Sequence, residues 1–228
     1  MKQPVKKVLI NGAQGKMGQA LIRLINELPQ LGLTVAATRQ AGQEVTADFD
    51  IIIDFSTPQG AQEAFALAKQ RRKAFLTGTT NLPEVFLFQM QQEEKIPVFF
   101  APNVSLSVYF FTQLAQQAAQ MYNGYGVHLH EIHHVHKKDA PSGTAKRLAE
   151  IVSLPAEKVT YERVGETVGT HAIKFNSPFD EISLTHKALN RDLFAKSALE
   201  IASWLVTCPG GFYTMSDYAK FKLKELKK

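Results

Sequence analysis

Three histidines and two lysines are concentrated in residues 131–145, which read EIHHVHKKDAPSGTA. An imidazole can donate or accept a proton near neutral pH, and a lysine ammonium pairs with a carboxylate. His133 is therefore our candidate general acid. Lys137 is a candidate for a second proton donor and for the anchor of a substrate carboxylate. His134 is a candidate for substrate contact.

The same stretch ends in a turn that suits an anion. A Pro-Ser-Gly-Thr sequence at residues 141–144 opens a helical pattern that continues to residue 151. The start of a helix offers unpaired backbone N–H groups and the positive end of the helix dipole. Gly143 and Thr144 are therefore candidates for holding a carboxylate. The whole stretch predicts a site for a small carboxylate that undergoes proton-coupled chemistry, rather than a histidine-rich surface loop.

The element that carries His133 is expected to be a strand. In a straight strand His133 and Lys137 would be roughly 13 Å apart, at about 3.3 Å per residue. The chain must therefore leave the strand between them if both are to touch one small ring. His134 would face the other way for as long as the strand continues.

Metal binding is the main chemical alternative for this region. In an extended segment His128, His130, His134 and His136 share one face, and imidazole is a common ligand of transition metals. A metal site needs ligands that converge, whereas residues strung along a strand diverge. The sequence has no HExxH motif and only one cysteine. We therefore predict no metal site.

A glycine-rich turn near the N-terminus predicts a dinucleotide site. Residues 12–18, GAQGKMG, follow a short apolar run at 8–10 and open a helical pattern at 17–28. Glycines at such a turn let a pyrophosphate approach the backbone at the helix N-terminus. The spacing is GxxGxxG rather than GxGxxG, so a merely tight turn is the alternative. The candidate cofactor residues are Gly12, Gly15, Lys16 and Met17.

The end of the second expected strand bears on which dinucleotide is used. An acidic residue there would accept hydrogen bonds from the adenine ribose of NAD, but the position holds Thr38. Arg39 and Lys16 could both pair with a 2′-phosphate. We therefore favour NADPH, with NADH as a usable second cofactor. The alternative for Arg39 is a solvated surface charge.

Three further turns follow expected strands, namely DFSTP at 54–58, GTT at 78–80 and APN at 101–103. Ligands of open α/β sheets bind at the carboxyl ends of the strands, so these turns are expected to line the cofactor. The candidate residues are Gly78, Thr79, Thr80, Ala101, Pro102, Asn103 and Val104.

The elements that position these residues form two groups. In the first group, strands alternate with helices, which favours a parallel sheet with right-handed crossovers. We expect strands at 8–10, 33–37, 51–55, 74–76 and 97–100, and helices at 17–28, 60–71 and 83–94. After residue 102 the pattern changes to an α+β type. Here we expect helices at 104–121, 141–151 and 196–206, the histidine-bearing strand, and strands at 159–163, 171–175 and 181–186.

The expected fold class is therefore α/β. A Rossmann dinucleotide-binding domain of residues 1–103 and 192–228 would be combined with an α+β domain of residues 104–191 that has an open mixed sheet. The absence of a repeat or low-complexity linker indicates that the domains share a close interface.

The bulk composition is that of an ordinary globular protein, with 228 residues, 45% hydrophobic and 21% charged. The single cysteine, Cys208, excludes an internal disulfide and favours a reducing compartment. No run of about 18 apolar residues occurs, so we expect a cytoplasmic protein without membrane contact. Much of the net charge of +5 lies at the two ends, without a basic aromatic stripe. Nucleic acid is therefore not an expected partner.

Residues 131–145 resemble the signature of the dihydrodipicolinate reductases, E-x-H-H-x-x-K-x-D-x-P-S-G-T-A, at every fixed position. The GxxGxMG turn and the DFS, GTT and APN segments are also similar to family segments. The resemblance spans nearly the whole chain. It departs from the family at Val104, where phenylalanine is usual, and at Ser107 and Tyr109, which leaves the shape of the nicotinamide pocket open.

The resemblance implies NAD(P)H-dependent reduction of 4-hydroxy-tetrahydrodipicolinate, a small cyclic dicarboxylate, in diaminopimelate and lysine biosynthesis. It also implies a homotetramer built through the open sheet of the 104–191 domain, which binds the substrate. Two alternatives remain. An aspartate or homoserine dehydrogenase would share the glycine turn but has no reason to carry HHxxK with PSGTA. A non-enzymatic NAD(P)-sensing module would lack the proton donor.

Overall fold

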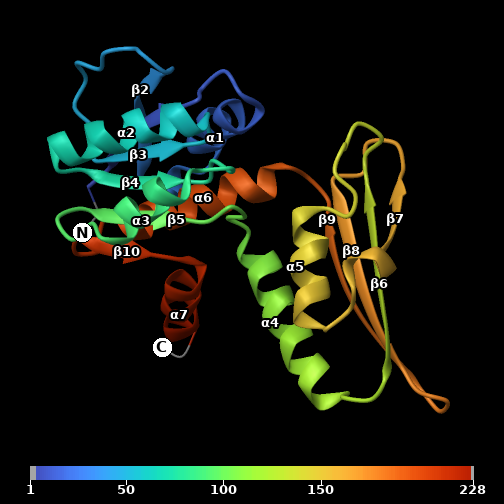
Figure 1. The fold of residues 1–228 in the computed structure, drawn as a ribbon. Coiled ribbons are helices and arrows are strands. Elements are labelled where there is room, and N and C mark those ends of the chain that lie inside the picture. The colour runs from blue at the N-terminus through green and yellow to red at the C-terminus, as the bar shows by residue number, and fades with distance from the viewer. Residues whose placement is uncertain (1–3, 227–228) are drawn as a thin grey trace. The chain divides into compact units, whose positions relative to one another are not determined.

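The computed structural model describes residues 4–226, in which the chain divides into two compact units (Figure 1). The first unit consists of Met1–Ser105 and Phe194–Lys228, and the second consists of Leu106–Leu193. The second unit is thus inserted between two segments of the first.

A six-stranded sheet, parallel throughout, forms the centre of the first unit. Its order is β10-β5-β4-β3-β1-β2. The central strands read as continuous apolar runs because helices cover both of their faces. The strands are β1 (Lys6–Asn11), β2 (Leu33–Arg39), β3 (Ile51–Asp54), β4 (Ala74–Thr77), β5 (Pro97–Phe100) and β10 (Gly211–Tyr213).

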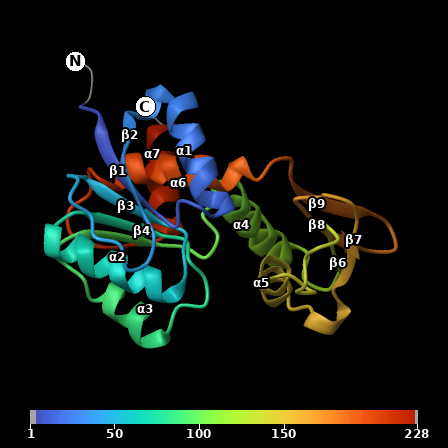
Figure 2. The ribbon, with the colours of Figure 1, turned by 90° about the horizontal axis from the view of Figure 1, so that it is seen from above.

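Helices cover this sheet in two layers. Figure 2 shows α1 and α6 on one face and α2 and α3 on the other. The helices are α1 (Lys16–Glu27), α2 (Pro58–Arg71), α3 (Glu84–Gln91), α6 (Asp192–Leu205) and α7 (Met215–Glu225), with a short 3-10 turn η1 (Pro29–Leu31). The chain leaves β1 and β3 toward opposite faces, so the crevice at the carboxyl ends of these two neighbours is the place where such sheets bind ligands.

The second unit packs two helices against a mixed four-stranded sheet of order β7-β6-β8-β9. β6 is parallel to β7 and antiparallel to β8, and β8 is antiparallel to β9. Figure 1 shows α4 and α5 on the same face of the sheet. The elements are α4 (Leu106–Met121), β6 (Gly126–His133), α5 (Gly143–Ile151), η2 (Ala156–Lys158), β7 (Thr160–Arg163), β8 (Gly169–Asn176) and β9 (Glu181–Ala188).

The expected fold class is confirmed, with a Rossmann-type parallel sheet and a separate mixed sheet. Two elements were not anticipated, β10 and α7. β10 is only three residues long and pairs with β5, far away in the sequence. α7 begins with a capping box between Thr214 and Asp217. Within residues 4–226, no helix is long and apolar enough to cross a membrane.

Candidate active site

Alternation along β6 brings an acid and an imidazole to the same buried face. Leu129, Glu131 and His133 are buried, whereas their neighbours are partly exposed. Glu131 lies opposite His171 of β8 in the strand register. The rings of His133 and His171 have centroids 5.1 Å apart. This face of the sheet thus holds a compact titratable cluster at the His133 end of β6.

Glu131 organises this cluster. Its Oε1 accepts the backbone N–H of Ser142 at 3.0 Å and a guanidinium N–H of Arg163 at 3.1 Å. Its Oε2 lies 3.3 Å from Nδ1 of His133 and 3.5 Å from Nε2 of His171. Burial by itself would raise the pKa of Glu131, but hydrogen bonding to His171 and Ser142 outweighs burial and lowers the pKa to about 2. The carboxylate is therefore ionised at neutral pH.

His133 is neutral in the free chain at neutral pH. Burial lowers its pKa to about 4; Glu131 opposes this shift, while His171, Lys137 and Arg163 add to it. The glycine at position 169 makes room for the ring, since a Cβ there would lie 3.0 Å from Nε2 of His133. A nearby anion would raise this pKa again, so the protonation state of His133 is set by what binds beside it.

Lys137 lies near His133 because the chain turns directly after β6. β6 ends at His133, and the backbone N–H of Lys137 donates to the carbonyl of His134 at 3.1 Å. The expectation that the chain leaves the strand between His133 and Lys137 is therefore confirmed. The Lys137 ammonium donates to both carboxylate oxygens of Asp139, at 2.7 and 2.9 Å. Its charge lies near enough to His133 to help lower the pKa of that imidazole.

Arg163, at the end of β7, holds the loop that carries Lys137. Its guanidinium donates to the backbone carbonyls of Lys137 at 3.3 Å and Asp139 at 2.6 Å, besides its bond to Glu131. Neither Arg163 nor His171 is among the site residues predicted from the sequence. The available signal was Glu131, which alternation places on the same strand face as His133. A buried acid needs donors around it.

The start of α5 carries Gly143 and Thr144, the residues that we expect to hold a carboxylate. Ser142 caps the helix, its Oγ accepting the N–H of Ala145 at 3.1 Å. Within residues 4–226, the backbone N–H groups of Gly143 and Thr144 have no hydrogen-bond acceptor. Because Ser142 also donates its N–H to Glu131, the helix start is fixed to the strand that carries His133.

The four histidines considered as metal ligands do not form one extended face. β6 ends at His133, so only His128 and His130 lie on it. His134 lies in the following turn, partly buried, and burial lowers its pKa. The structure instead brings Glu131, His133 and His171 together, with ligand atoms within 4.8 Å of one another. One oxygen of that carboxylate, Oε1, accepts Ser142 and Arg163, and the other, Oε2, faces the two imidazoles.

In the first unit, the glycine turn forms a cradle that larger residues would fill. Gly12 has φ +82°, and a Cβ on it would lie 2.4 Å from the carbonyl oxygen of Phe55. A Cβ on Gly18, which was not among the expected cofactor residues, would lie 2.4 Å from the Gly12 carbonyl oxygen. Gly15 is the N-cap residue of α1 and offers no side-chain cap, and Lys16 is exposed in the first turn beside Met17. The helix start is therefore open to a pyrophosphate.

A buried carboxylate organises the neighbouring strand ends. Asp54 at the end of β3 is fully buried and accepts Nδ2 of Asn11 at 2.7 Å. It also accepts the hydroxyls of Thr77 and Thr79, each at 2.7 Å, and that of Ser56. The GTT turn is thus tied to the glycine turn through Asp54. The hydroxyl of Thr79 is hydrogen-bonded to Asp54, whereas Gly78 and Thr80 contribute no side chain to this network.

The last expected cofactor segment follows β5. The backbone N–H of Ala101 donates to the carbonyl of Thr77 at 3.3 Å, which continues the sheet edge. Pro102 is exposed and Asn103 is partly exposed, with its side-chain oxygen accepting the N–H of Ser105 at 3.0 Å. Val104 is buried. The segment lies at the same carboxyl edge as the glycine turn, because all six strands are parallel.

Arg39 is not a solvated surface charge. It lies at the end of β2 opposite Asn11, with only 5% of its surface exposed. Its guanidinium donates to Oδ1 of Asn11 at 2.9 Å and to the Gln43 carbonyl at 3.1 Å. It also forms an ion pair with Glu63 at 2.7 Å. The alternative of a solvated surface charge is therefore wrong, and Arg39 belongs to the polar network of the strand ends.

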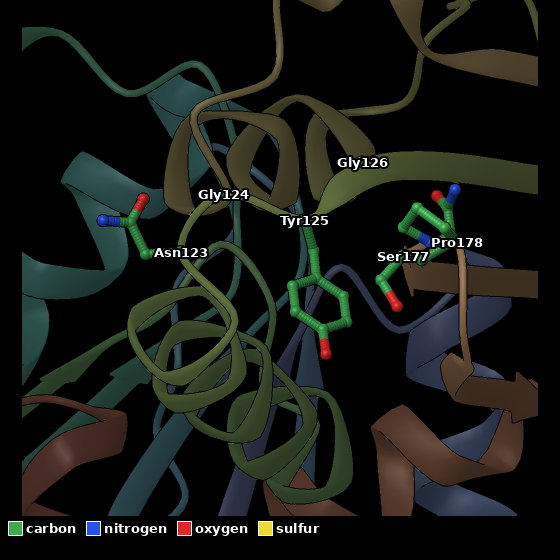
Figure 3. Close-up of a pocket in the computed structure, with 7 residues that line it drawn as sticks. Asn123, Gly124, Tyr125, Gly126, Ser177 and Pro178 are labelled. Carbon is green, nitrogen blue, oxygen red and sulfur yellow. The ribbon is translucent and has the colours of Figure 1, made fainter.

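A surface hollow elsewhere in the second unit does not share this chemistry (Figure 3). It is lined by residues 123–126 and 176–178, at the Gly126 end of β6, which is the opposite end from His133. Figure 3 shows Tyr125 and Ser177 among its side chains. The lining residues include no carboxylate, imidazole or ammonium. The titratable cluster around Glu131 is therefore the better candidate for proton chemistry.

Two features of the chain correspond to the two halves of one reaction. The first half is the carboxyl edge of the parallel sheet, which is of the dinucleotide-binding type. The second half is the separate imidazole–carboxylate cluster with the start of α5. The first half suits a hydride-carrying nucleotide, and the second suits proton transfer to an anionic substrate. The class that the fold and these sites define is the nucleotide-dependent oxidoreductases.

Comparison with known proteins narrows this class. The family model described as "Dihydrodipicolinate reductase, N-terminus" matches residues 6–104, and the model described as "Dihydrodipicolinate reductase, C-terminus" matches residues 107–218. The chain belongs to the dihydrodipicolinate reductase family.

Curated relatives and solved structures agree with this family. A 4-hydroxy-tetrahydrodipicolinate reductase from Xanthomonas euvesicatoria pv. vesicatoria is 37% identical over 92% of this chain and 96% of its own. The enzyme of that name from Campylobacter jejuni subsp. doylei is 34% identical over 93% of this chain and 96% of its own. The fold is similar to that of a dipicolinate-bound dihydrodipicolinate reductase from Paenisporosarcina sp. TG-14. There the TM-score is 0.75 at 20% identity, over 92% of this chain and 97% of that one.

Proposed function

We propose that this chain catalyses the NAD(P)H-dependent reduction of 4-hydroxy-tetrahydrodipicolinate to tetrahydrodipicolinate in diaminopimelate and lysine biosynthesis. The relatives named above support this reaction. The overall conversion takes up one hydride and one proton and releases the 4-hydroxyl as water. The structural observation that carries the proposal is the buried Glu131–His133 pair beside the anion-binding start of α5.

The proton chemistry is assigned to His133 and Lys137. A dicarboxylate bound beside His133 raises the pKa of this imidazole, because negative charge favours its protonated form. His133 then takes up the proton that it delivers to the reduced ring. Lys137 pairs with one carboxylate, in exchange for Asp139, and serves as a second proton donor. The N–H groups of Gly143 and Thr144, with the Thr144 hydroxyl, hold the other carboxylate, and His134 completes the contact.

A nicotinamide dinucleotide bound at the glycine turn would supply the hydride. Gly12 and Gly15 would let the pyrophosphate approach the start of α1, where Met17 lies in the first turn, and Lys16 would add positive charge. Of the two nucleotides we propose NADPH as the preferred one, because Lys16 and Arg39 are cations near the expected adenosine end.

We also propose a homotetramer built through the open face of the four-stranded sheet. Figure 1 shows α4 and α5 on one face of this sheet, and no helix of the described second unit covers the other. That outer face presents His128, His130 and Thr185 among its residues. The reducing cytoplasm is the proposed compartment, in line with a single cysteine.

The function is tested by following oxidation of NADPH and of NADH while dihydrodipicolinate synthase supplies the substrate. We expect oxidation only when the synthase and both of its substrates are present. His133→Gln should lower the turnover number by about 10²-fold or more and leave nucleotide binding intact. His136→Gln is the matched control, since its imidazole is 77% exposed. Unchanged turnover in His133→Gln would contradict the catalytic assignment.

A further inference from the structure

The environment of Arg39 differs from that of a residue held ready for a phosphate. A guanidinium has five N–H donors. The guanidinium of Arg39 donates hydrogen bonds to Asn11, Gln43 and Glu63. The side chain is 6% exposed, so it cannot swing freely into solvent to meet a ligand. Any anion that approaches Arg39 must do so beside the carboxylate that already pairs with it.

Glu63 is more open than its partner and is held from several sides. Its carboxylate, on the second turn of α2, is 30% exposed. One oxygen accepts both Arg39 and the backbone N–H of Gly42, at 2.7 and 2.8 Å. The other accepts the side-chain amide of Gln59 at 3.2 Å. The hydrogen bonds from Gly42 and Arg39 lower the pKa of Glu63, so the group carries its negative charge at neutral pH.

The ion pair between Arg39 and Glu63 lies at the end of β2, where the adenine ribose of a nucleotide is expected to bind. In doubly wound sheets, the residue at the end of the second strand faces the adenine ribose. An acid there accepts the 2′-hydroxyl of NADH, and its negative charge repels the 2′-phosphate of NADPH. This chain has Thr38 at that place, and Glu63 brings a carboxylate to the same strand end from α2 instead.

We propose that Glu63 is the residue that sets the balance between NADPH and NADH in this chain. It supplies the carboxylate that position 38 lacks, and it offsets the attraction of Arg39 for a 2′-phosphate. The inference rests on the proposed function in one respect, that the glycine turn binds a nicotinamide dinucleotide. It makes the chain a user of both nucleotides rather than a strict NADPH enzyme.

A purely structural role for Glu63 makes a different prediction. If the carboxylate only fastened the loop after β2 to α2 through Gly42, its removal would weaken both nucleotides equally. If it sets the balance, removing its charge would strengthen NADPH binding relative to NADH. The ratio of the two dissociation constants therefore separates the two roles, and a single affinity does not.

The test is direct titration of the full-length chain with NADPH and with NADH by calorimetry, without substrate. The variants are Glu63→Gln, which removes the charge at constant shape, and Glu63→Asp, which keeps the charge with a shorter reach. Glu84→Gln removes an exposed charge in the first turn of α3 and is the matched control. We expect Glu63→Gln to shift the ratio of dissociation constants toward NADPH on the order of tenfold. Glu63→Asp should shift it less, and Glu84→Gln should leave it as in the wild type.

Two results would overturn the inference, and they differ. If the wild-type chain binds both nucleotides and Glu63→Gln leaves their ratio unchanged, Glu63 does not select and the proposed function stands. If the wild-type chain binds neither nucleotide, the proposed function fails, and the inference fails with it. Steady-state rates with each nucleotide, compared as kcat/KM, should show the same change of ratio as the titrations.

Discussion

Glu131 accepts the backbone N–H of Ser142 at 3.0 Å, so one carboxylate joins the end of β6 to the first residue that caps α5. His133 and the start of α5 are thus positioned by the same buried charge. Arg163 balances this charge and fastens the Lys137 loop to it. The geometry of the proposed substrate site therefore depends on Glu131, a residue that need not touch the substrate.

Replacing Glu131 tests this dependence. Glu131→Gln keeps one acceptor but removes the charge beside Arg163, and we expect it to lower the free energy of unfolding by about 2–3 kcal/mol. The turnover number should fall as well, because His133 and the start of α5 lose their common anchor. Urea unfolding and steady-state kinetics measure the two effects.

Glu150→Gln is the matched control for that experiment. Glu150 pairs with Arg147 on the exposed side of α5, and both side chains are more than half exposed. Its removal should change stability by less than about 1 kcal/mol. If Glu131→Gln changed stability no more than Glu150→Gln did, the anchoring role of Glu131 would be refuted.

The pH dependence of stability follows from the lowered pKa values of His133 and Glu131. His133 has its pKa lowered from 6.5 to about 4 in the folded chain, so the unfolded chain binds more protons between these values. Stability from His133 is therefore present above pH 6.5 and is lost as the pH falls toward 4. Glu131 adds a second loss between pH 4.5 and about 2.

Urea unfolding at a series of pH values measures this loss. His133→Gln should remove a part of the slope between pH 6.5 and 4, on the order of 1–3 kcal/mol over the window. His136→Gln should keep the full slope. A His133→Gln chain with the wild-type slope would show that His133 titrates normally in the folded state.

Gly18 should tolerate no side chain. In Gly18→Ala the new Cβ would lie 2.4 Å from the Gly12 carbonyl oxygen and 2.5 Å from Cα of Ala13, both backbone atoms. The glycine turn must then shift, at a cost of about 1–3 kcal/mol or more. We expect weaker binding of both nucleotides, measured by titration.

Gly143, which has room for a Cβ, is the control for the stability measurement on Gly18→Ala. A Cβ on Gly143 would meet nothing within 4 Å, so Gly143→Ala should unfold at nearly the wild-type urea concentration. If Gly18→Ala matched Gly143→Ala in stability and bound nucleotide normally, the close packing of α1 against the turn would not matter.

Asp54→Asn tests the network behind the GTT turn. Four side-chain donors converge on this carboxylate, and an amide can accept only some of them. We expect a rise in the KM for the nucleotide with a smaller change in kcat, because the turn loses its fixed position while the proposed proton donor, His133, lies in the other unit. A fall in kcat with unchanged KM would contradict this account.

The candidate site could be predicted from sequence to the extent that it is local. His133, Lys137 and the Ser-Gly-Thr turn lie within one short stretch, and the strand, turn and helix around them follow from residue types. The glycine turn was recognised for the same reason. The structure also confirms that the chain leaves β6 before Lys137.

The rest depends on strand register, which no local pattern fixes. His171 meets Glu131 because β8 pairs with β6 in antiparallel register, and Arg163 reaches Glu131 through the parallel pairing of β7 with β6. Glu63 meets Arg39 across 24 residues of chain. β10 has three residues, and its pairing with β5 joins segments more than a hundred residues apart. Hydrophobic periodicity carries no information on such pairings.

The insertion of the second unit between two segments of the first has a consequence for the order of events during synthesis. β10 is the edge neighbour of β5, and α6 and α7 come from the same late segment. As the chain leaves the ribosome, residues 106–193 are complete while the first unit still lacks its last strand and two helices. The second unit is therefore free to fold first. Until residues 211–213 emerge, the edge of β5 is unpaired and can form hydrogen bonds with an incorrect strand.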